Sequence, residues 1–248
     1  MKYQDINAKT IDRWTEEGWT WGIPISHEQY LQAKQGDWEV LLSPNRPMPK
    51  EWIGDLKGKK ILGLASGGGQ QMPVFAAAGA ICSVLDYSQK QIESEKMVAQ
   101  REGYMIDAIK GDMTEILPYE NDHFDIVFNP VSFCYVQDIL PIYREVYRIL
   151  KKGGIFVSAC DNEINYMVDE QEKEIVNHMP FDPLKDTEQL DQLIKSDIGV
   201  QFSHSLEEIV GGQLKAGFRI DDIYEDTNET GRLKDLSIST YVVTKSVK

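Results

Sequence analysis

Cysteine is scarce in this sequence, and the three that occur, Cys82, Cys134 and Cys160, lie far apart. They form no C-x-x-C pair, and no histidine stands at the spacing of a shared metal site. The pattern argues against a disulfide framework and a structural zinc site, so no metal is expected.

Long hydrophobic runs are also missing. No apolar stretch approaches the roughly 18 residues that a membrane-spanning helix needs. The first residues, MKYQDINAKTIDRW, are polar and mixed in charge, unlike a secretory signal peptide. These features predict a cytoplasmic protein without a membrane partner.

Basic residues are few relative to acidic ones. The chain has 26 Lys and Arg against 40 Asp and Glu, which gives a formal net charge of −14. Because nucleic-acid binding relies on Lys and Arg to neutralise phosphates, the sequence predicts no nucleic-acid partner. The hydrophobic fraction of 42% is sufficient for a globular core, and 248 residues fit a single domain.

From Lys59 onward, short apolar strands alternate with helices. This alternation predicts an α/β fold: a Rossmann-like, seven-stranded, mostly parallel sheet with helices on both faces. The last two strands, at 218–224 and 238–245, are joined by a short polar connection, so the last strand is expected to be antiparallel. The other strands are expected at 60–64, 81–86, 107–110, 124–129 and 155–159, and helices at 71–78, 88–102, 139–150 and 205–216.

We expect residues 1–248 to form one domain with four parts. The N-terminal part, 1–55, has four of the five tryptophans before its proline-rich stretch at 43–49 and is predicted to be a lid or cap, with helices at 6–17 and 27–34. The cofactor-binding core is predicted at 59–159. Residues 160–203 break the alternation and are predicted to be a second cap, with helices at 169–178 and 187–194. Residues 204–248 form the C-terminal helix and strand pair.

The first motif is ILGLASGGG at residues 61–69, where a strand runs into three consecutive glycines before a helix. Glycine lets the backbone approach a ligand, and open α/β sheets bind ligands at the carboxyl ends of their strands. The loop is not a P-loop, because no Gly-Lys-Ser/Thr follows. The loop also fails to match the dinucleotide-binding motif G-x-G-x-x-G. If the motif starts at Ala65, Gln70 stands at the third glycine, and if it starts at Gly67, Met72 stands there. A nicotinamide-dependent oxidoreductase is therefore the least favoured alternative.

Two acidic residues follow the loop at the ends of later strands. Asp86 lies about twenty residues beyond it, where a carboxylate can bind ribose hydroxyls. Asp112 follows the third strand and can accept a hydrogen bond from an adenine amino group. Tyr87 is placed to lie against an adenine. Simpler roles, as a helix cap for Asp86 and a packing aromatic for Tyr87, stay open.

In order and spacing these motifs resemble the class I S-adenosylmethionine-dependent methyltransferases, of the type 11 methyltransferase-domain family. The loop resembles that family's V-L-D-L-G-x-G-x-G, residues 124–128 its fourth strand, and residues 144–154 the end of its fifth helix. The resemblance implies S-adenosylmethionine as cofactor, S-adenosylhomocysteine as product, and transfer to an N, O or S atom of a small-molecule acceptor. It implies cofactor binding by Gly63, Ala65, Ser66, Gly67, Gly69, Asp86, Tyr87, Asp112, Met113 and Asn129.

Two loop positions depart from the family pattern. Gly63 replaces the usual acid of the first strand, and Ala65 replaces the first loop glycine. Because that acid often orients the loop or the cofactor, a non-catalytic protein that binds S-adenosylmethionine or S-adenosylhomocysteine stays an alternative.

The turn after the fourth strand reads Asn129-Pro130-Val131-Ser132-Phe133. Amino-methylating enzymes carry Asn/Asp-Pro-Pro-Tyr/Phe there, but here the second proline is Val131 and the aromatic comes one place late. An amino-directed protein methyltransferase is therefore a further alternative. No general base is evident; Asn129 and Tyr135 are the catalytic candidates.

The acceptor pocket is expected to form outside the common core. We predict that the N-terminal region and residues 160–203 close over the cofactor's methyl group, because both carry large apolar side chains outside the alternating core. The alternative is that the tryptophans cover one edge of the sheet. The chain is expected to be a monomer or homodimer. The substrate and lid candidates are Trp14, Trp19, Trp21, Phe133 and Cys134.

Overall fold

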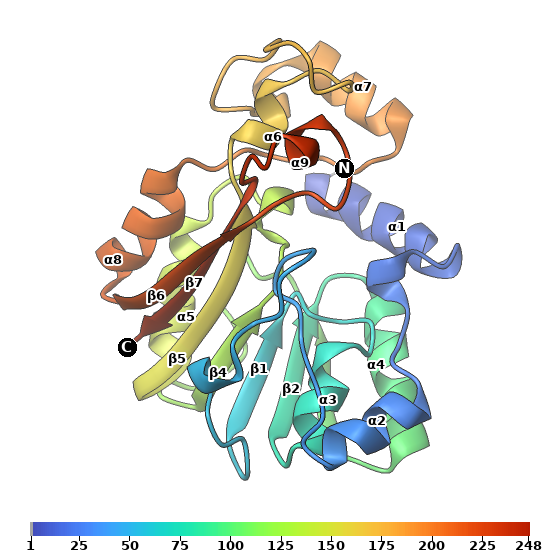
Figure 1. The fold of residues 1–248 in the computed structure, drawn as a ribbon, viewed down its shortest axis with the longest axis vertical. Coiled ribbons are helices and arrows are strands. Elements are labelled where there is room, and N and C mark those ends of the chain that lie inside the picture. The colour runs from blue at the N-terminus through green and yellow to red at the C-terminus, as the bar shows by residue number, and fades with distance from the viewer. Residues whose placement is uncertain (1) are drawn as a thin grey trace.

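The computed structural model describes residues 2–248 and confirms the predicted fold (Figure 1). Within these residues seven strands form one sheet in the order β3-β2-β1-β4-β5-β7-β6. Strand β7 runs antiparallel to its neighbours β5 and β6, and the other pairs are parallel. The strands are β1 (Lys60–Leu64), β2 (Ile81–Asp86), β3 (Ile106–Lys110), β4 (Phe124–Asn129), β5 (Leu150–Asp161), β6 (Arg219–Asp226) and β7 (Tyr241–Val247).

Local signals in the sequence explain where helices begin and end. The helix after β2, α4, starts where the Ser88 hydroxyl accepts the N–H of Gln91, and it ends at Gly103, whose φ is 73°. The helices are α1 (Tyr3–Glu16), α2 (His27–Lys34), α3 (Gln71–Ala77), α4 (Gln89–Glu102), α5 (Leu140–Ile149), α6 (Ile164–Met167), α7 (Thr187–Ser196), α8 (Gly212–Ala216) and α9 (Arg232–Asp235).

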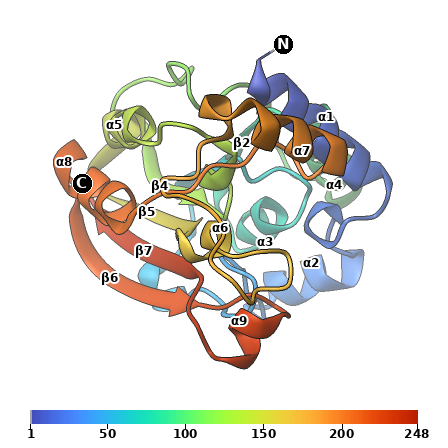
Figure 2. The ribbon, with the colours of Figure 1, turned by 90° about the horizontal axis from the view of Figure 1, so that it is seen from above.

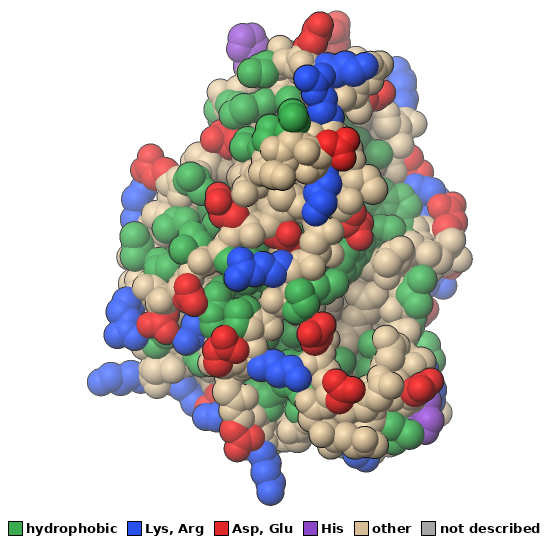
Figure 3. Space-filling view, in the orientation of Figure 1, with side chains coloured by type: hydrophobic (Ala, Val, Ile, Leu, Met, Phe, Trp, Pro, Cys, Tyr) green, Lys and Arg blue, Asp and Glu red, His purple; other side chains and the backbone are tan. Residues whose placement is uncertain are grey.

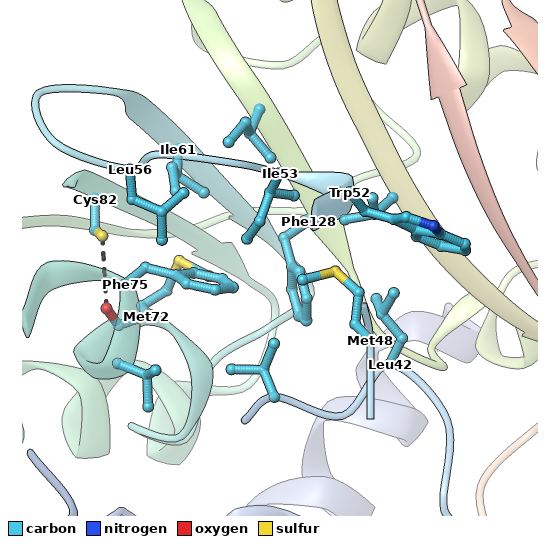
Figure 4. Packing of buried hydrophobic residues seen from close by; sticks show 14 of the residues in the cluster. Leu42, Met48, Trp52, Ile53, Leu56, Ile61, Met72, Phe75, Cys82 and Phe128 are labelled. Atoms are coloured by element: carbon cyan, nitrogen blue, oxygen red, sulfur yellow. Dashed lines mark hydrogen bonds between the residues drawn. The ribbon is translucent and has the colours of Figure 1, made fainter. Parts of the chain in front are cut away.

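Strand β1 is buried on both faces, as its unbroken apolar sequence predicts for a parallel strand. Ile61 packs in a cluster with Met72 and Phe75 of α3. Leu62 packs in a second cluster with residues of α5. Figure 4 shows the first cluster, in which the side chains of Met72 and Phe75 lie close to Phe128 of β4.

The N-terminal region divides into two parts. Helix α1 lies near the carboxyl ends of the strands, above α4 at the right of Figure 1 and at the upper right of the view from above in Figure 2. Residues 40–56 instead contribute side chains such as Met48 and Trp52 to the core cluster around α3. Trp52 also contacts Tyr224 of β6, with ring centroids 5.4 Å apart. This second part covers the sheet, and its residues 41–44 also reach the strand ends.

The prediction of a helix at 169–178 is wrong. The segment forms a turn closed by a bridge between Val168 and Ile175. The Asp169 carboxylate accepts the backbone N–H groups of Lys173 and Glu174, which offers the chain an alternative to helical hydrogen bonds.

Several other elements differ in extent from the prediction, two of them most clearly. Strand β5 begins directly at Leu150 and reaches Asp161, whereas the sequence predicted only 155–159. The helix expected at 205–216 starts with a π-helical turn, Glu207–Gly211, before α8.

The strand order reverses between β1 and β4, because the chain continues from β1 to β2 on one side and from β4 to β5 on the other. Open α/β sheets bind ligands in the crevice at the carboxyl ends beside such a reversal. No helix in residues 2–248 has the length and apolarity to cross a membrane.

Candidate functional site

A cavity of about 370 Å³ lies at the carboxyl ends of the strands, within the range typical of small-molecule sites. Its wall combines the glycine loop, the ends of β2, β3, β5 and β7, the turn after β4, helix α1 and the Trp19–Trp21 segment. Segments far apart in the sequence therefore meet at the predicted place.

The glycine loop is tied to the end of β2. The Gly67 N–H donates to Asp86 Oδ2 at 3.0 Å, and the Ser88 N–H donates to Asp86 Oδ1 at 2.9 Å. A Cβ on Gly67 would lie only 2.6 Å from Cβ of Gln91. Close approach thus requires glycine here, and the loop backbone forms a cradle with the Asp86 carboxylate beside it.

A second carboxyl group, Glu95, holds the loop from behind. The Gly69 N–H donates to Glu95 Oε1 at 2.7 Å, and the Glu95 side chain is fully buried. Burial, reinforced by the nearby Asp86, raises the pKa of Glu95 to about 8. The sequence analysis did not single out Glu95. The available signal was its position four residues after Gln91, which places both side chains on the same face of α4.

The structure shows the surroundings of Gly63 and Ala65, the two positions that depart from the family's loop pattern. A Cβ on Gly63 would lie 2.9 Å from Sδ of Met72, so the Met72 side chain occupies the space beside Gly63. Ala65 adopts a φ of 47°, in the left-handed region that favours glycine.

Replacing Ala65 with glycine is therefore expected to stabilise the protein. The strain removed from the folded state is larger than the stabilisation that glycine gives to the unfolded chain through its greater conformational entropy. Ala65→Gly should therefore raise the free energy of unfolding by about 0.5–1 kcal/mol. Urea denaturation measures this change. The matched control is Ala78→Gly, at an ordinary φ of −77°, which should lower stability. A loss of stability in both variants would contradict the backbone argument.

The side of the cavity near β2 and β3 carries four of the predicted cofactor residues: Asp86, Tyr87, Asp112 and Met113. Asp112 Oδ1 accepts hydrogen bonds from the Thr114 N–H at 2.8 Å and the Thr114 hydroxyl at 2.7 Å. The Tyr87 hydroxyl donates to Asp5 of α1 at 3.0 Å.

Trp19, Trp21, Cys134 and Tyr135 of the predicted set also line the cavity, as do Ala65, Ser66 and Gly67 of the glycine loop. Asp161 also lines this cavity, although the sequence did not predict it. Its signal was its place at the carboxyl end of β5, which was missed because the strand was predicted to end at Ala159. Gln201 and Tyr241 were missed as well.

Five of the predicted residues do not belong to the cavity wall: Gly63, Gly69, Asn129, Trp14 and Phe133. Asn129 is fully buried, and its amide nitrogen donates to the Leu64 carbonyl oxygen at 2.8 Å and to Ser132 Oγ at 2.9 Å. It thereby fastens the turn after β4 to the end of β1.

The two aromatic residues in this group have packing partners instead. Phe133 is fully buried in the core, with its ring 5.5 Å from that of Tyr143. Trp14 packs against Trp19, with ring centroids 5.2 Å apart. The burial of Phe133 and the contact of Trp14 with Trp19 explain these side chains without a ligand.

Helix α1 is docked onto the segment that leads out of the predicted second cap. The Asn7 amide donates to the Val200 carbonyl oxygen at 3.0 Å and accepts the Val200 N–H at 2.6 Å. Arg13 pairs with Asp197 at 2.5 Å. Because Asn7 and Gln201 both line the cavity, the two predicted cap regions meet at its wall.

Histidine contributes no group to this wall. His204 is buried, with Nε2 3.0 Å from the Phe133 carbonyl oxygen and 2.9 Å from that of Val136, and burial lowers its pKa. Among the described residues that line the cavity there is no Lys, Arg or His. Within residues 2–248 no group of three or more His, Cys, Asp or Glu is arranged to hold a metal ion.

Comparison with known proteins agrees with this geometry. Residues 62–158 match the model of a methyltransferase domain family. The chain is 36% identical over 249 residues to the uncharacterized methyltransferase YbaJ of Bacillus subtilis, an alignment that covers 98% of this chain and 97% of YbaJ. An uncharacterized methyltransferase of Synechocystis is 29% identical over 189 residues, covering 74% of this chain and 82% of that protein.

Among solved structures, an S-adenosylmethionine-dependent methyltransferase from Mesorhizobium loti has the same fold. It superposes with a TM-score of 0.63 at 18% identity, covering 80% of this chain and 95% of the other. The near full-length match to YbaJ, together with the domain match and the fold, shows that this chain belongs to the class I S-adenosylmethionine-dependent methyltransferase family.

Proposed function

We propose that this methyltransferase transfers a methyl group to an N, O or S atom of a small molecule and releases S-adenosylhomocysteine. The observation that carries the proposal is the continuous cavity from Asp86 and the glycine loop to Tyr135 and Asp161. One such space can hold a cofactor and an acceptor side by side.

The residues present fit S-adenosylmethionine. The Asp86 carboxylate has lone pairs left for ribose hydroxyls after accepting its two backbone N–H groups. Asp112 and Met113 would flank the adenine, and the backbone at Ala65, Ser66 and Gly67 would face the methionine part. These assignments continue the predictions from the sequence.

Bound S-adenosylmethionine supplies a methyl group already activated on a positively charged sulfur. The chain therefore has mainly to align the acceptor with it, and alignment of this kind is worth roughly 7–11 kcal/mol. Trp19, Trp21 and Leu42 in the wall would exclude water from the reacting atoms.

A small acceptor is favoured over a polymer. The net charge is −14, and acidic and basic side chains are interspersed over the face shown in Figure 3. The amino-directed reading depended on Asn129, whose side chain is fully buried and does not line the cavity. The cytoplasmic location stays a prediction.

Calorimetric titration with S-adenosylmethionine, S-adenosylhomocysteine and NAD, side by side, tests this function. We expect the first two to bind with micromolar or tighter affinity and NAD not to bind. Since Trp19 and Trp21 line the cavity, tryptophan fluorescence should change on addition of S-adenosylmethionine. Binding of NAD in preference to S-adenosylmethionine would overturn the proposal.

A further inference from the structure

The carboxylate of Asp161 lines the cavity although its side chain is almost completely buried, with 6% of the residue exposed. It ends β5 and pairs in register with Tyr241 of β7. The Tyr166 hydroxyl donates to Asp161 Oδ2 at 2.5 Å. A buried carboxylate is costly unless donors surround it, so the partners of its other oxygen decide its role.

That other oxygen, Oδ1, is left with a weak contact. The Cys160 thiol lies 3.9 Å away and is the one side-chain donor to Oδ1 among the described residues, while the backbone N–H of Asp161 itself also donates to the carboxylate. A ligand that enters the cavity with an N–H or O–H group can satisfy Oδ1.

The charges of the wall favour one kind of ligand. The wall contains three aspartates, Asp86, Asp112 and Asp161, and among the described lining residues there is no Lys, Arg or His to balance them. Such a site attracts a cation and repels an acceptor with a carboxylate or phosphate. The rings of Tyr135 and Tyr241 also line this part of the cavity, and aromatic faces attract ammonium groups.

The position of Asp161 separates it from the predicted cofactor residues. Asp86 ends β2, and in the sheet order β2 lies three strands from β5, a distance of roughly 14 Å at the usual strand spacing. A ribose at the end of β2 and an acceptor at the end of β5 would leave the transferred methyl group between them.

Resting on the function proposed above, we propose that Asp161 binds the ammonium group of a small primary or secondary amine acceptor and takes up its proton. The acceptor gives one N–H proton to the carboxylate, and the freed lone pair forms the new N–CH₃ bond. The S–CH₃ bond breaks with its electron pair left on sulfur, so the sulfonium becomes a neutral thioether. The methylated ammonium keeps the positive charge, and Asp161 passes its proton to water.

The surroundings of Asp161 fit this use. The titratable groups around it are Tyr135, Tyr166, Tyr241, Cys134 and Cys160, and none of them is cationic at neutral pH. Burial raises the pKa of Asp161 to about 6, partly offset by the Tyr166 hydrogen bond. The carboxylate is therefore ionised at pH 8, and amine binding should weaken as the pH falls through 6.

Binding experiments on the full chain saturated with S-adenosylhomocysteine test the proposal. The probes are phenethylamine, phenethyl alcohol and phenylacetate, which differ mainly in the charged or polar group. We expect the amine to bind at least tenfold more tightly than the other two at pH 8. In Asp161→Asn this preference should vanish, together with the pH dependence of amine binding between pH 8 and 5. An amine that binds no more tightly than the alcohol, or a preference retained in the variant, would overturn the proposal.

Controls separate this inference from the proposed function. Asp161→Asn should bind S-adenosylhomocysteine within twofold of the wild type, whereas failure of the wild type to bind it would reject the function itself. Asp125→Asn, whose carboxylate pairs with Lys151 at the amino end of β4, should keep the amine preference. If Asp161→Asn does not fold, Tyr166→Phe serves instead: it should keep the preference and move the pH midpoint of amine binding upward. An unmoved midpoint would count against Asp161.

Discussion

Asp86→Ala is expected to weaken the binding of S-adenosylmethionine by ten- to about a hundredfold. A hydrogen bond to a charged group contributes roughly 1.5–3 kcal/mol, and each 1.4 kcal/mol changes the dissociation constant tenfold. Asp86 also fixes the loop by accepting the Gly67 N–H, so its loss removes a ligand contact and loosens the cradle. Calorimetric titration measures the effect.

A substitution of Asp112, the other acidic residue predicted to bind the cofactor, provides the comparison for Asp86→Ala. Asp112→Asn should weaken binding less than Asp86→Ala, because the amide oxygen can still accept a hydrogen bond from adenine. A thermal melt of each variant shows whether it is folded. An unchanged dissociation constant in folded Asp86→Ala would refute the assignment to ribose.

The fold could be predicted because parallel strands are buried on both faces. Such strands need unbroken apolar sequences, and β1, β2 and β4 have the bounds that these sequences predicted. The glycine loop and Asp86 could be predicted for a related reason. The carboxyl ends of parallel strands meet at one edge, so residues that follow them in sequence converge in space.

Side-chain direction was harder to predict. Asn129 and Phe133 follow β4, so their position suggested the cavity, yet Asn129 turns toward the end of β1 and Phe133 into the core. Neighbouring residues of a turn point in different directions, and the packing that decides between them is a property of the whole fold. The helix predicted at 169–178 failed for a local reason, because Asp169 binds the backbone ahead of it.

Asp161 and Glu95 were missed because their importance depends on burial. Asp161 became visible only when β5 proved to extend to it. Glu95 lies on an ordinary polar helix by composition, and the structure places it on the buried side of that helix behind the glycine loop. For both carboxyl groups it is desolvation that raises the pKa, and desolvation is set by tertiary packing.

Glu95→Gln is expected to remove a pH-dependent loss of stability. Because the pKa is raised from 4.5 in the unfolded chain to about 8 in the folded one, the unfolded state releases this proton first. The contribution of Glu95 to stability is therefore complete below pH 4.5 and falls as the pH rises toward 8. From the two pKa values, the loss is on the order of 4 kcal/mol. Glutamine cannot ionise, and its side-chain oxygen can still accept the Gly69 N–H.

Urea denaturation at pH 5, 7 and 9 tests this expectation through a difference. The free energy of unfolding of Glu95→Gln minus that of the wild type should increase steadily from pH 5 to 9, whatever its value at pH 5. Asp86 and Asp161, whose pKa values are also raised by burial, are present in both proteins, so their contributions largely cancel in this difference. The matched control is Glu93→Gln, the same substitution on the exposed side of the same helix; an equal increase there would show that burial is not the cause. A flat difference for Glu95→Gln would mean that Glu95 is already ionised behind the loop at neutral pH, and that the Gly69 N–H stabilises its charge enough to offset burial.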